Sequence, residues 1–141
     1  MEWDGFDKGV FLVNVLGIVK DPNDGHFLIG RRENDPHIEN LTWCFPGGRA
    51  GYDEDLETYL KEEIKKKTGF DVKVERIMFA RTFPGKEEFL LIYYLCEVIG
   101  GEAVAGGKFV ELKWVKPEEL EEHFTTSLDS RLLMQLKTIE L

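Results

Sequence analysis

The sequence predicts an α/β protein in which helices cover both faces of a mixed β-sheet, folded as a single domain over residues 1–141. Apolar segments typical of strands are interleaved with amphipathic segments that have helical spacing. Short turns between neighbouring strand-like segments also favour antiparallel pairs within the sheet. This mixture is typical of a layered α/β domain. A chain of this length buries roughly two thirds of its unfolded surface around one core.

The first part of the chain contains two strand-like segments around a sharp turn. Residues 10–19 are apolar on both faces, as expected of a buried central strand. The stretch Asp21-Pro-Asn-Asp-Gly25 is rich in strong turn formers, so residues 26–32 are predicted to return as the second strand of a hairpin. Beyond a polar loop, residues 43–45 form a short strand that ends at Pro46-Gly47-Gly48.

Residues 53–68 are predicted to form the first long helix. Acidic residues stand in its first turn and lysines in its last, which complements the helix dipole. Leu56, Leu60 and Ile64 recur at helical spacing and supply one buried stripe. Gly69 follows directly and is well placed as a C-terminal cap.

The remaining chain contributes three strands and two helices. We expect strands at 72–82, 89–98 and 109–115, with a glycine-rich flexible loop at 100–107. Pro117 occupies a favoured position in the first turn of a short helix. The spacing of Leu128, Leu132 and Leu136 predicts a final amphipathic helix.

The composition is that of an ordinary globular protein with an acidic balance: 43% of the residues are hydrophobic and 32% are charged. The net charge of −9 argues against broad binding to nucleic acid, although a small anionic ligand needs only a local basic pocket. No apolar run approaches the roughly 20 residues of a membrane span. The amino terminus is acidic and lacks the pattern of a signal peptide. With only Cys44 and Cys96, we expect a cytoplasmic protein with reduced thiols and no membrane partner.

The stretch after the glycine pair carries a recognisable motif, which reads Gly48-x5-Glu54-x7-Glu62-Glu63-Ile64-x-Lys66-Lys67-x-Gly69-Phe70. This spacing resembles the Nudix box of the MutT-like hydrolases, in which the pattern is Gly, Glu, Arg-Glu, an apolar residue, Glu-Glu and Gly. The resemblance extends over nearly the whole chain and implies a Nudix-type α/β/α sandwich. It also implies a hydrolase of a nucleoside diphosphate linked to another group.

The resemblance implies, position by position, a catalytic and metal-binding set. Glu63 matches a glutamate that binds metal or acts as the base, and Glu54 matches the first glutamate of the box. The Gly48 carbonyl is a further implied ligand. Glu111, three residues before Trp114, is a candidate accessory ligand. The implied cofactor is Mg²⁺, which prefers hard oxygen ligands.

Three positions depart from the box: Glu62 replaces its arginine, and Lys66 and Lys67 replace two metal-binding glutamates. An ammonium group about 6 Å from Mg²⁺, at an effective dielectric near 20, is repelled by roughly 5 kcal/mol. We therefore expect a weakened metal site. Two interpretations stay open. The lysines pair with Glu62 and Glu63 in a purely structural helix, or Lys66 or Lys67 binds phosphate and supplies part of the metal charge.

The segments around the box are similar to those of the GDP-mannose mannosyl hydrolases, a Nudix branch that also has an altered box. That similarity implies that Arg49 stabilises a departing nucleoside diphosphate, and that Arg31 or Arg32 contributes to binding it. The similarity is distant. The branch has a metal-binding glutamate where this chain has Lys67. It also uses a histidine a few residues before a tryptophan, and this chain has no histidine in that position before Trp114.

Two functional hypotheses follow. The first is a divergent hydrolase of a nucleoside diphosphate derivative such as a nucleotide-sugar. Glu63, Glu54 and Arg49 carry the chemistry, and Mg²⁺ is weakly bound. The second is a non-catalytic module that binds a nucleotide or a partner protein. The expected partner is a small nucleotide. A homodimer is common in such folds, and Trp3 and Phe6 are candidates for its interface.

Overall fold

A computed structural model describes residues 8–139, so the candidate interface residues Trp3 and Phe6 lie outside the described residues. The sheet has the strand order β3-β2-β1-β6-β5, while β4 pairs with β1 and β7 pairs with β2. The strands are β1 (Leu12–Lys20), β2 (Phe27–Arg32), β3 (Trp43–Cys44), β4 (Gly47–Arg49), β5 (Phe70–Phe83), β6 (Lys86–Gly101) and β7 (Phe109–Val115). The helices are α1 (Leu56–Thr68), α2 (Leu120–His123) and α3 (Ser130–Thr138), with a 3-10 turn at Pro117–Glu119.

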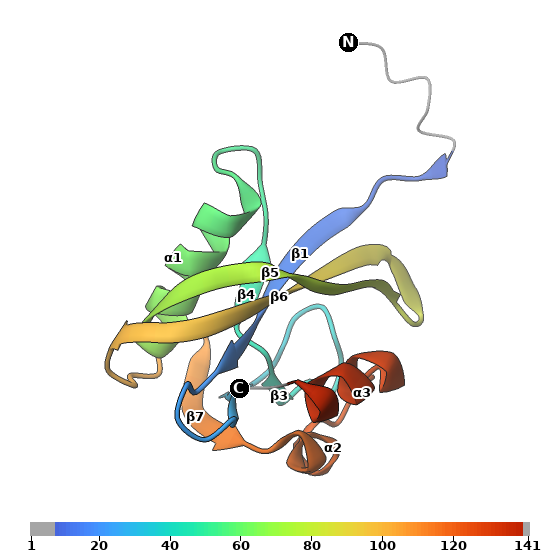
Figure 1. Ribbon diagram of the computed structural model, residues 1–141. Helices are drawn as coiled ribbons and strands as arrows, with labels where there is room; N and C mark the ends of the chain where they lie inside the picture. The colour runs from blue at the N-terminus through green and yellow to red at the C-terminus, as the bar shows by residue number, and fades with distance from the viewer. Residues whose placement is uncertain (1–7, 140–141) are drawn as a thin grey trace.

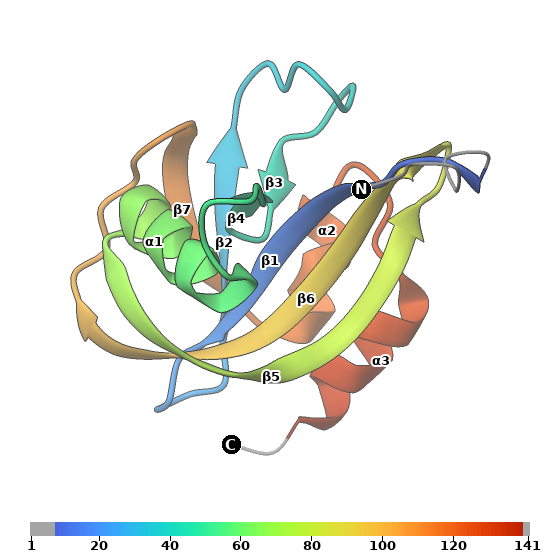
Figure 2. The same ribbon diagram turned by 90° about the horizontal axis from the view of Figure 1, so that it is seen from above.

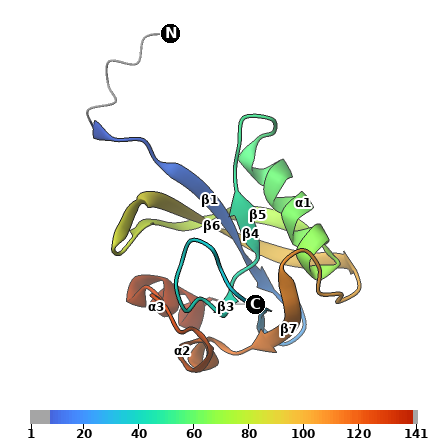
Figure 3. The ribbon, with the colours of Figure 1, turned by 180° about the vertical axis from the view of Figure 1, so that it is seen from behind.

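Helices cover the two faces of this sheet, as the sequence predicts. Figures 1 and 3 show α1 on one side of the strands and α2 and α3 on the other. Each face has its own apolar core. Leu60 and Ile64 of α1 pack into one core, and Leu132 and Leu136 of α3 pack into the other. The predicted mixed α/β/α architecture is therefore confirmed.

Strand β1 is the central strand that its apolar sequence predicts. It runs parallel to β6 from Leu12 to Lys20 and antiparallel to β4. The side chains of Val15, Ile18 and Val19 on β1 are fully buried. Figure 2 shows β1 and β6 side by side across the middle of the sheet.

Strands β5 and β6 form a long antiparallel hairpin whose tight turn contains Pro84 and Gly85. Both strands extend beyond the predicted ranges 72–82 and 89–98, because backbone pairing continues where the apolar residues stop. Lys86, for example, is exposed, yet it pairs in register with Phe83. Side-chain patterns mark only the buried part of such a hairpin, whereas hydrogen bonding sets its ends.

Helix α1 begins three residues later than the predicted start, because Asp55 is its N-cap. The Asp55 carboxylate accepts a hydrogen bond of 2.9 Å from the backbone N–H of Thr58. Its C-terminal end is the predicted one, since Gly69 adopts a left-handed conformation with φ 81°. The cap residues thus fix both ends of the helix that carries the motif.

The predicted final helix is α3, which contains Leu132 and Leu136 but begins after Leu128, because Asp129 caps it and accepts a hydrogen bond of 2.8 Å from the backbone N–H of Arg131. Strand β7 matches its predicted range, and Pro117 begins the short helical segment as expected. Among the described residues, no helix has both the length and the apolar character needed to cross a membrane.

Candidate functional site

The glycine pair lets strand β4 pass between β1 and α1. A Cβ atom on Gly47 would overlap the backbone carbonyl oxygen of Val15, and one on Gly48 would overlap the Tyr59 hydroxyl of α1. Glycine is therefore needed at Gly47 for steric reasons, whereas a side chain at Gly48 would displace the end of Tyr59. The tight packing places the carbonyl of Gly47 and the side chain of Arg49 beside the helix that carries the motif.

Lys67 contacts two oxygen groups at this point. Its ammonium nitrogen lies 3.3 Å from a Glu63 carboxylate oxygen, one helical turn earlier. The same ammonium donates a short hydrogen bond to the backbone carbonyl of Gly47. The Lys67 and Glu63 side chains are only 18% and 16% exposed, so the pair is shielded from bulk water.

Lys66, the other lysine of the motif, lies on the same cavity as the Lys67–Glu63 pair. Lys66 and Lys67 both line the cavity described below. Lys65, in contrast, pairs with Asp71 at 3.2 Å and donates to the Gly69 carbonyl, outside that cavity. The three consecutive lysines of α1 therefore divide into two that face the site and one that closes the helix end.

A cavity of about 440 Å³ opens beside β4 and the end of α1. Cationic side chains outnumber carboxylates along its wall, with Asp35 and Glu63 as the two acids. The cationic residues are Arg32, Arg49, Lys66, Lys67, Arg81 and Lys108. In a chain with a net charge of −9, this concentration of positive charge favours an anionic ligand.

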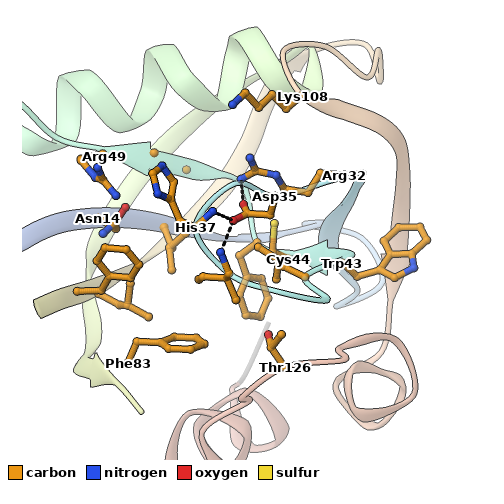
Figure 4. A pocket seen from close by; sticks show the side chains of 18 of the residues that line it. Asn14, Arg32, Asp35, His37, Trp43, Cys44, Arg49, Phe83, Lys108 and Thr126 are labelled. Carbon is orange, nitrogen blue, oxygen red and sulfur yellow. Dashed lines mark hydrogen bonds and ion pairs between the residues drawn. The ribbon is translucent and has the colours of Figure 1, made fainter. Parts of the chain in front are cut away.

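The cavity has a charged end and an aromatic end. Figure 4 shows Arg49 and Lys108 toward one end, with Phe83 toward the other. The aromatic residues that line it are Trp43, Phe45, Phe83, Phe89, Tyr93, Phe109 and Phe124. Such a cavity suits a ligand that joins an anionic group to a flat or apolar group.

Two of the arginines are held by neighbours. The guanidinium of Arg49 lies 5.3 Å from the centre of the Phe89 ring, in a cation–π contact. Arg32 pairs with Asp35 at 3.0 Å. Asp35 also accepts hydrogen bonds from the backbone N–H groups of His37 and Ile38. These contacts orient both arginines at the cavity without a ligand.

Arg81 reinforces the aromatic end. Its guanidinium donates to the Ser127 hydroxyl at 2.8 Å and to the Ser127 carbonyl at 3.0 Å. It also donates to the Tyr93 hydroxyl at 3.3 Å. Because several of its donors are used in this way, Arg81 holds the segment before α3 against the sheet.

Three of the residues predicted for the site lie outside the cavity lining. Arg31 pairs with Glu111 at 2.9 Å and with Glu33 at 3.1 Å, so the candidate ligand Glu111 contacts an arginine. The Glu54 side chain contacts that of Glu62, and this contact raises the pKa of the Glu54 carboxyl. The structure therefore brings Glu63, Gly48, Arg49, Arg32 and both motif lysines together, and it places Arg31, Glu54 and Glu111 elsewhere.

Cys44 lines the cavity but is not set up as a nucleophile. Burial raises the pKa of its thiol to about 11, so the thiolate is scarce at neutral pH. The environment of Cys44 is that of a packing residue.

The side chains present do not fit Mg²⁺. Within residues 8–139, no group of three or more His, Cys, Asp or Glu side chains is placed to hold a metal ion. The Glu63 carboxylate and the Gly47 carbonyl, which are hard oxygen donors, are both bound by the Lys67 ammonium. A magnesium ion needs several such oxygens in an octahedral shell, so the predicted weak metal site is not supported by the donors around Glu63.

Several cavity residues were not predicted from the sequence, among them Asn14, Asp35, Arg81 and Lys108. Asn14 could have been noticed as a polar residue inside an otherwise apolar strand. The loop that carries Lys108 is fixed to α1, because the backbone N–H of Gly106 donates to the carbonyl of Lys67 at 3.0 Å. No local signal in the sequence reveals that contact.

Comparison with known proteins agrees with this architecture. Residues 10–136 match the NUDIX domain family. The chain is 26% identical to a nucleoside triphosphatase NudI from Escherichia coli O139:H28, over 82% of this chain and 89% of that protein. It is similar in fold to the MutT protein of Methanosarcina mazei Go1, with 20% identity, a TM-score of 0.70, and coverage of 89% of this chain and 91% of that chain. It is also similar to an ADP-ribose pyrophosphatase from Streptococcus suis, with 18% identity, a TM-score of 0.68, and coverage of 92% and 94%. The chain belongs to the Nudix family of hydrolases.

Proposed function

We propose that this protein is a divergent Nudix hydrolase whose substrate is a nucleoside diphosphate linked to another group, such as a sugar. The observation that carries the proposal is the cavity with one cationic and one aromatic end. Its volume of about 440 Å³ is in the range of small-molecule sites. The names of its relatives, a nucleoside triphosphatase and an ADP-ribose pyrophosphatase, support a phosphate-containing substrate.

The substrate would lie along the cavity with its diphosphate at the charged end. Arg49, Lys66, Lys67 and Lys108 are the cations available to the phosphate oxygens there. The aromatic end would take the base or the second group, because flat rings stack well on aromatic side chains. Arg31, which pairs with Glu111 and Glu33, is not needed for this arrangement.

Hydrolysis requires a base for the attacking water and stabilisation of the leaving group. Glu63 is the carboxylate on the cavity wall beside the motif lysines, and we assign it the role of accepting the proton from water. The water oxygen bonds to the atom of the linked group that carries the diphosphate, the bond from that atom to the diphosphate oxygen breaks, and the nucleoside diphosphate leaves. The cations then stabilise the charge that develops on that leaving group. Glu54 lies outside the cavity lining, and its predicted catalytic role is tested separately by Glu54→Gln.

The test is to incubate the protein with a panel of nucleoside-diphosphate derivatives and to identify products by phosphorus NMR, in Mg²⁺ and in chelator. Cleavage of one class supports the hydrolase, and the products identify the bond that breaks. An absence of turnover with every compound in both conditions contradicts it.

A second candidate function is nucleotide binding without cleavage, and the Lys67–Glu63 contact favours it. The Lys67 ammonium lies 3.3 Å from a carboxylate oxygen of Glu63, so it occupies an oxygen that would otherwise be open to the attacking water. In this case the same NMR experiment shows ligand-dependent shifts in chelator and no products. Binding that requires Mg²⁺ contradicts this second candidate.

A further inference from the structure

The ammonium of Lys67 fills a position between two hard oxygen groups. It donates to the Gly47 carbonyl and lies 3.3 Å from the Glu63 carboxylate. Oxygens of these two kinds are typical ligands of a hard metal cation in proteins. Here the cation between them is a side chain of the protein itself.

The backbone at both oxygen groups is fixed independently of Lys67. Gly47 is buried and pairs with Leu16 in the antiparallel β1–β4 ladder, so its carbonyl is held by the sheet. Glu63 precedes the fully buried Ile64 on α1, so the packing of the helix sets the point from which its side chain extends. The sheet and the helix therefore bring the two oxygen groups to the same place.

The stem of Lys67 is enclosed as well. A Cβ atom on Gly107 would come within 3.1 Å of the Lys67 Cγ atom, so this loop passes close to the stem. The neighbouring Gly106 binds the Lys67 carbonyl through a hydrogen bond of 3.0 Å. Because its stem is already enclosed, Lys67 loses less rotamer freedom than an exposed lysine when its ammonium forms a contact.

We propose that the Lys67 ammonium is the resident cation of this site and takes the place of a divalent metal ion. An ammonium group has three N–H donors. One of them is donated to the Gly47 carbonyl while the ammonium pairs with Glu63 at 3.3 Å, which leaves a donor for an oxygen of the bound diphosphate. Only this last contact rests on the proposed function. The replacement of a metal by Lys67 concerns the empty protein and is tested without a nucleotide.

The experiment measures binding of Mn²⁺ alone to the full chain by electron paramagnetic resonance, which counts free metal directly. The wild-type protein should bind Mn²⁺ only at millimolar concentrations. Lys67→Glu removes the ammonium and adds a carboxylate to the Glu63–Gly47 pair. We expect its Mn²⁺ affinity to rise by about 100-fold, because a positive charge beside the metal is replaced by a negative one.

The matched control is Lys65→Glu, which changes the net charge equally, lies outside the cavity and leaves the Lys67 ammonium in place. Its affinity for Mn²⁺ should rise by less than about 10-fold, because only a charge outside the cavity changes. Equal gains in the two variants overturn the proposal, and so does micromolar Mn²⁺ binding by the wild type. If circular dichroism shows that Lys67→Glu does not fold, Lys67→Gln replaces it. This variant only frees the two oxygens, so it should bind Mn²⁺ more tightly than the wild type, and no gain overturns the proposal.

A failure of the proposed function gives a different result. It would appear as an absence of turnover with every compound of the nucleoside-diphosphate panel, in Mg²⁺ and in chelator. The Mn²⁺ measurements would then still report on whether Lys67 occupies a cation site.

Discussion

The ammonium nitrogen of Lys67 lies 3.3 Å from the carboxylate of Glu63, one turn earlier on the same helix. The pair joins the residue that we assign as the base to a cation on the wall of the same cavity. Both side chains are mostly shielded from solvent, so the interaction is less screened than a surface ion pair. The properties of the cavity therefore depend on these two residues together.

The motif lysines should bind the diphosphate. A unit charge about 6 Å from a phosphate charge, at an effective dielectric near 20, contributes about 2.8 kcal/mol, or about 100-fold in affinity. The double variant Lys66→Glu/Lys67→Glu should therefore bind ADP in chelator at least about 100-fold more weakly by calorimetry. Lys65→Glu is the control, because Lys65 pairs with Asp71 outside the cavity. An equal loss in the control would mean that only overall charge matters.

Glu63 should be required for turnover. General-base catalysis contributes about 100-fold or more, so Glu63→Gln should lower kcat by at least that factor on any substrate found in the panel. Glu57→Gln is the matched control, since Glu57 is an exposed glutamate of the same helix that does not line the cavity. Unchanged kcat in Glu63→Gln contradicts the assigned role.

The glycine pair should be required for folding as much as for function. A Cβ on Gly47 would overlap the Val15 carbonyl oxygen, whereas one on Gly51 would meet no atom within 4 Å. Gly47→Ala should therefore lower the free energy of unfolding by about 2 kcal/mol or more, as overpacking does. Gly51→Ala should change it by less than about 0.5 kcal/mol. Urea unfolding of both variants checks this, and equal stabilities would show that β4 tolerates a side chain.

The contact between Glu54 and Glu62 should make stability depend on pH. The pKa of Glu54 is raised above its ordinary value of 4.5 by this contact. Because the pKa of Glu54 is higher in the folded than in the unfolded protein, ionisation of this carboxyl destabilises the fold. This destabilisation is absent below the pKa of the unfolded state and grows as the pH rises through the pKa of the folded state. Glu62→Arg should therefore raise the thermal unfolding midpoint at about pH 7 and have much less effect at about pH 4. A pH-independent change in the midpoint would contradict this origin.

The fold could be predicted largely from local signals. The apolar strand at β1, the turn before β2, and the lysine-rich end of α1 with its glycine cap all depend on neighbouring residues. The start of α1 was missed because Asp55 acts as its N-cap. The Asp55 carboxylate accepts a backbone hydrogen bond, and composition alone does not show which acid of the run Asp53-Glu54-Asp55 does so.

The site could be predicted only in part. The motif spacing predicts that Gly48, Glu63, Lys66 and Lys67 lie near one another, and all four line the cavity, since they lie on one loop and one helix. It could not reveal the contribution of Lys108, which reaches the cavity because a distant loop binds the end of α1. That placement depends on tertiary contacts. Strand β4 was also missed, because a short glycine-rich segment carries no strand pattern.

The claim that side-chain cations hold the diphosphate is tested most directly by measuring the binding of ADP to the wild-type protein by calorimetry, in chelator and in Mg²⁺. If the side-chain cations of the cavity hold the diphosphate, ADP binds in chelator at least as tightly as in Mg²⁺, because free ADP carries more negative charge than its magnesium complex. Binding that is seen only with Mg²⁺ would contradict the account, since a metal ion and not Lys67 would then hold the diphosphate.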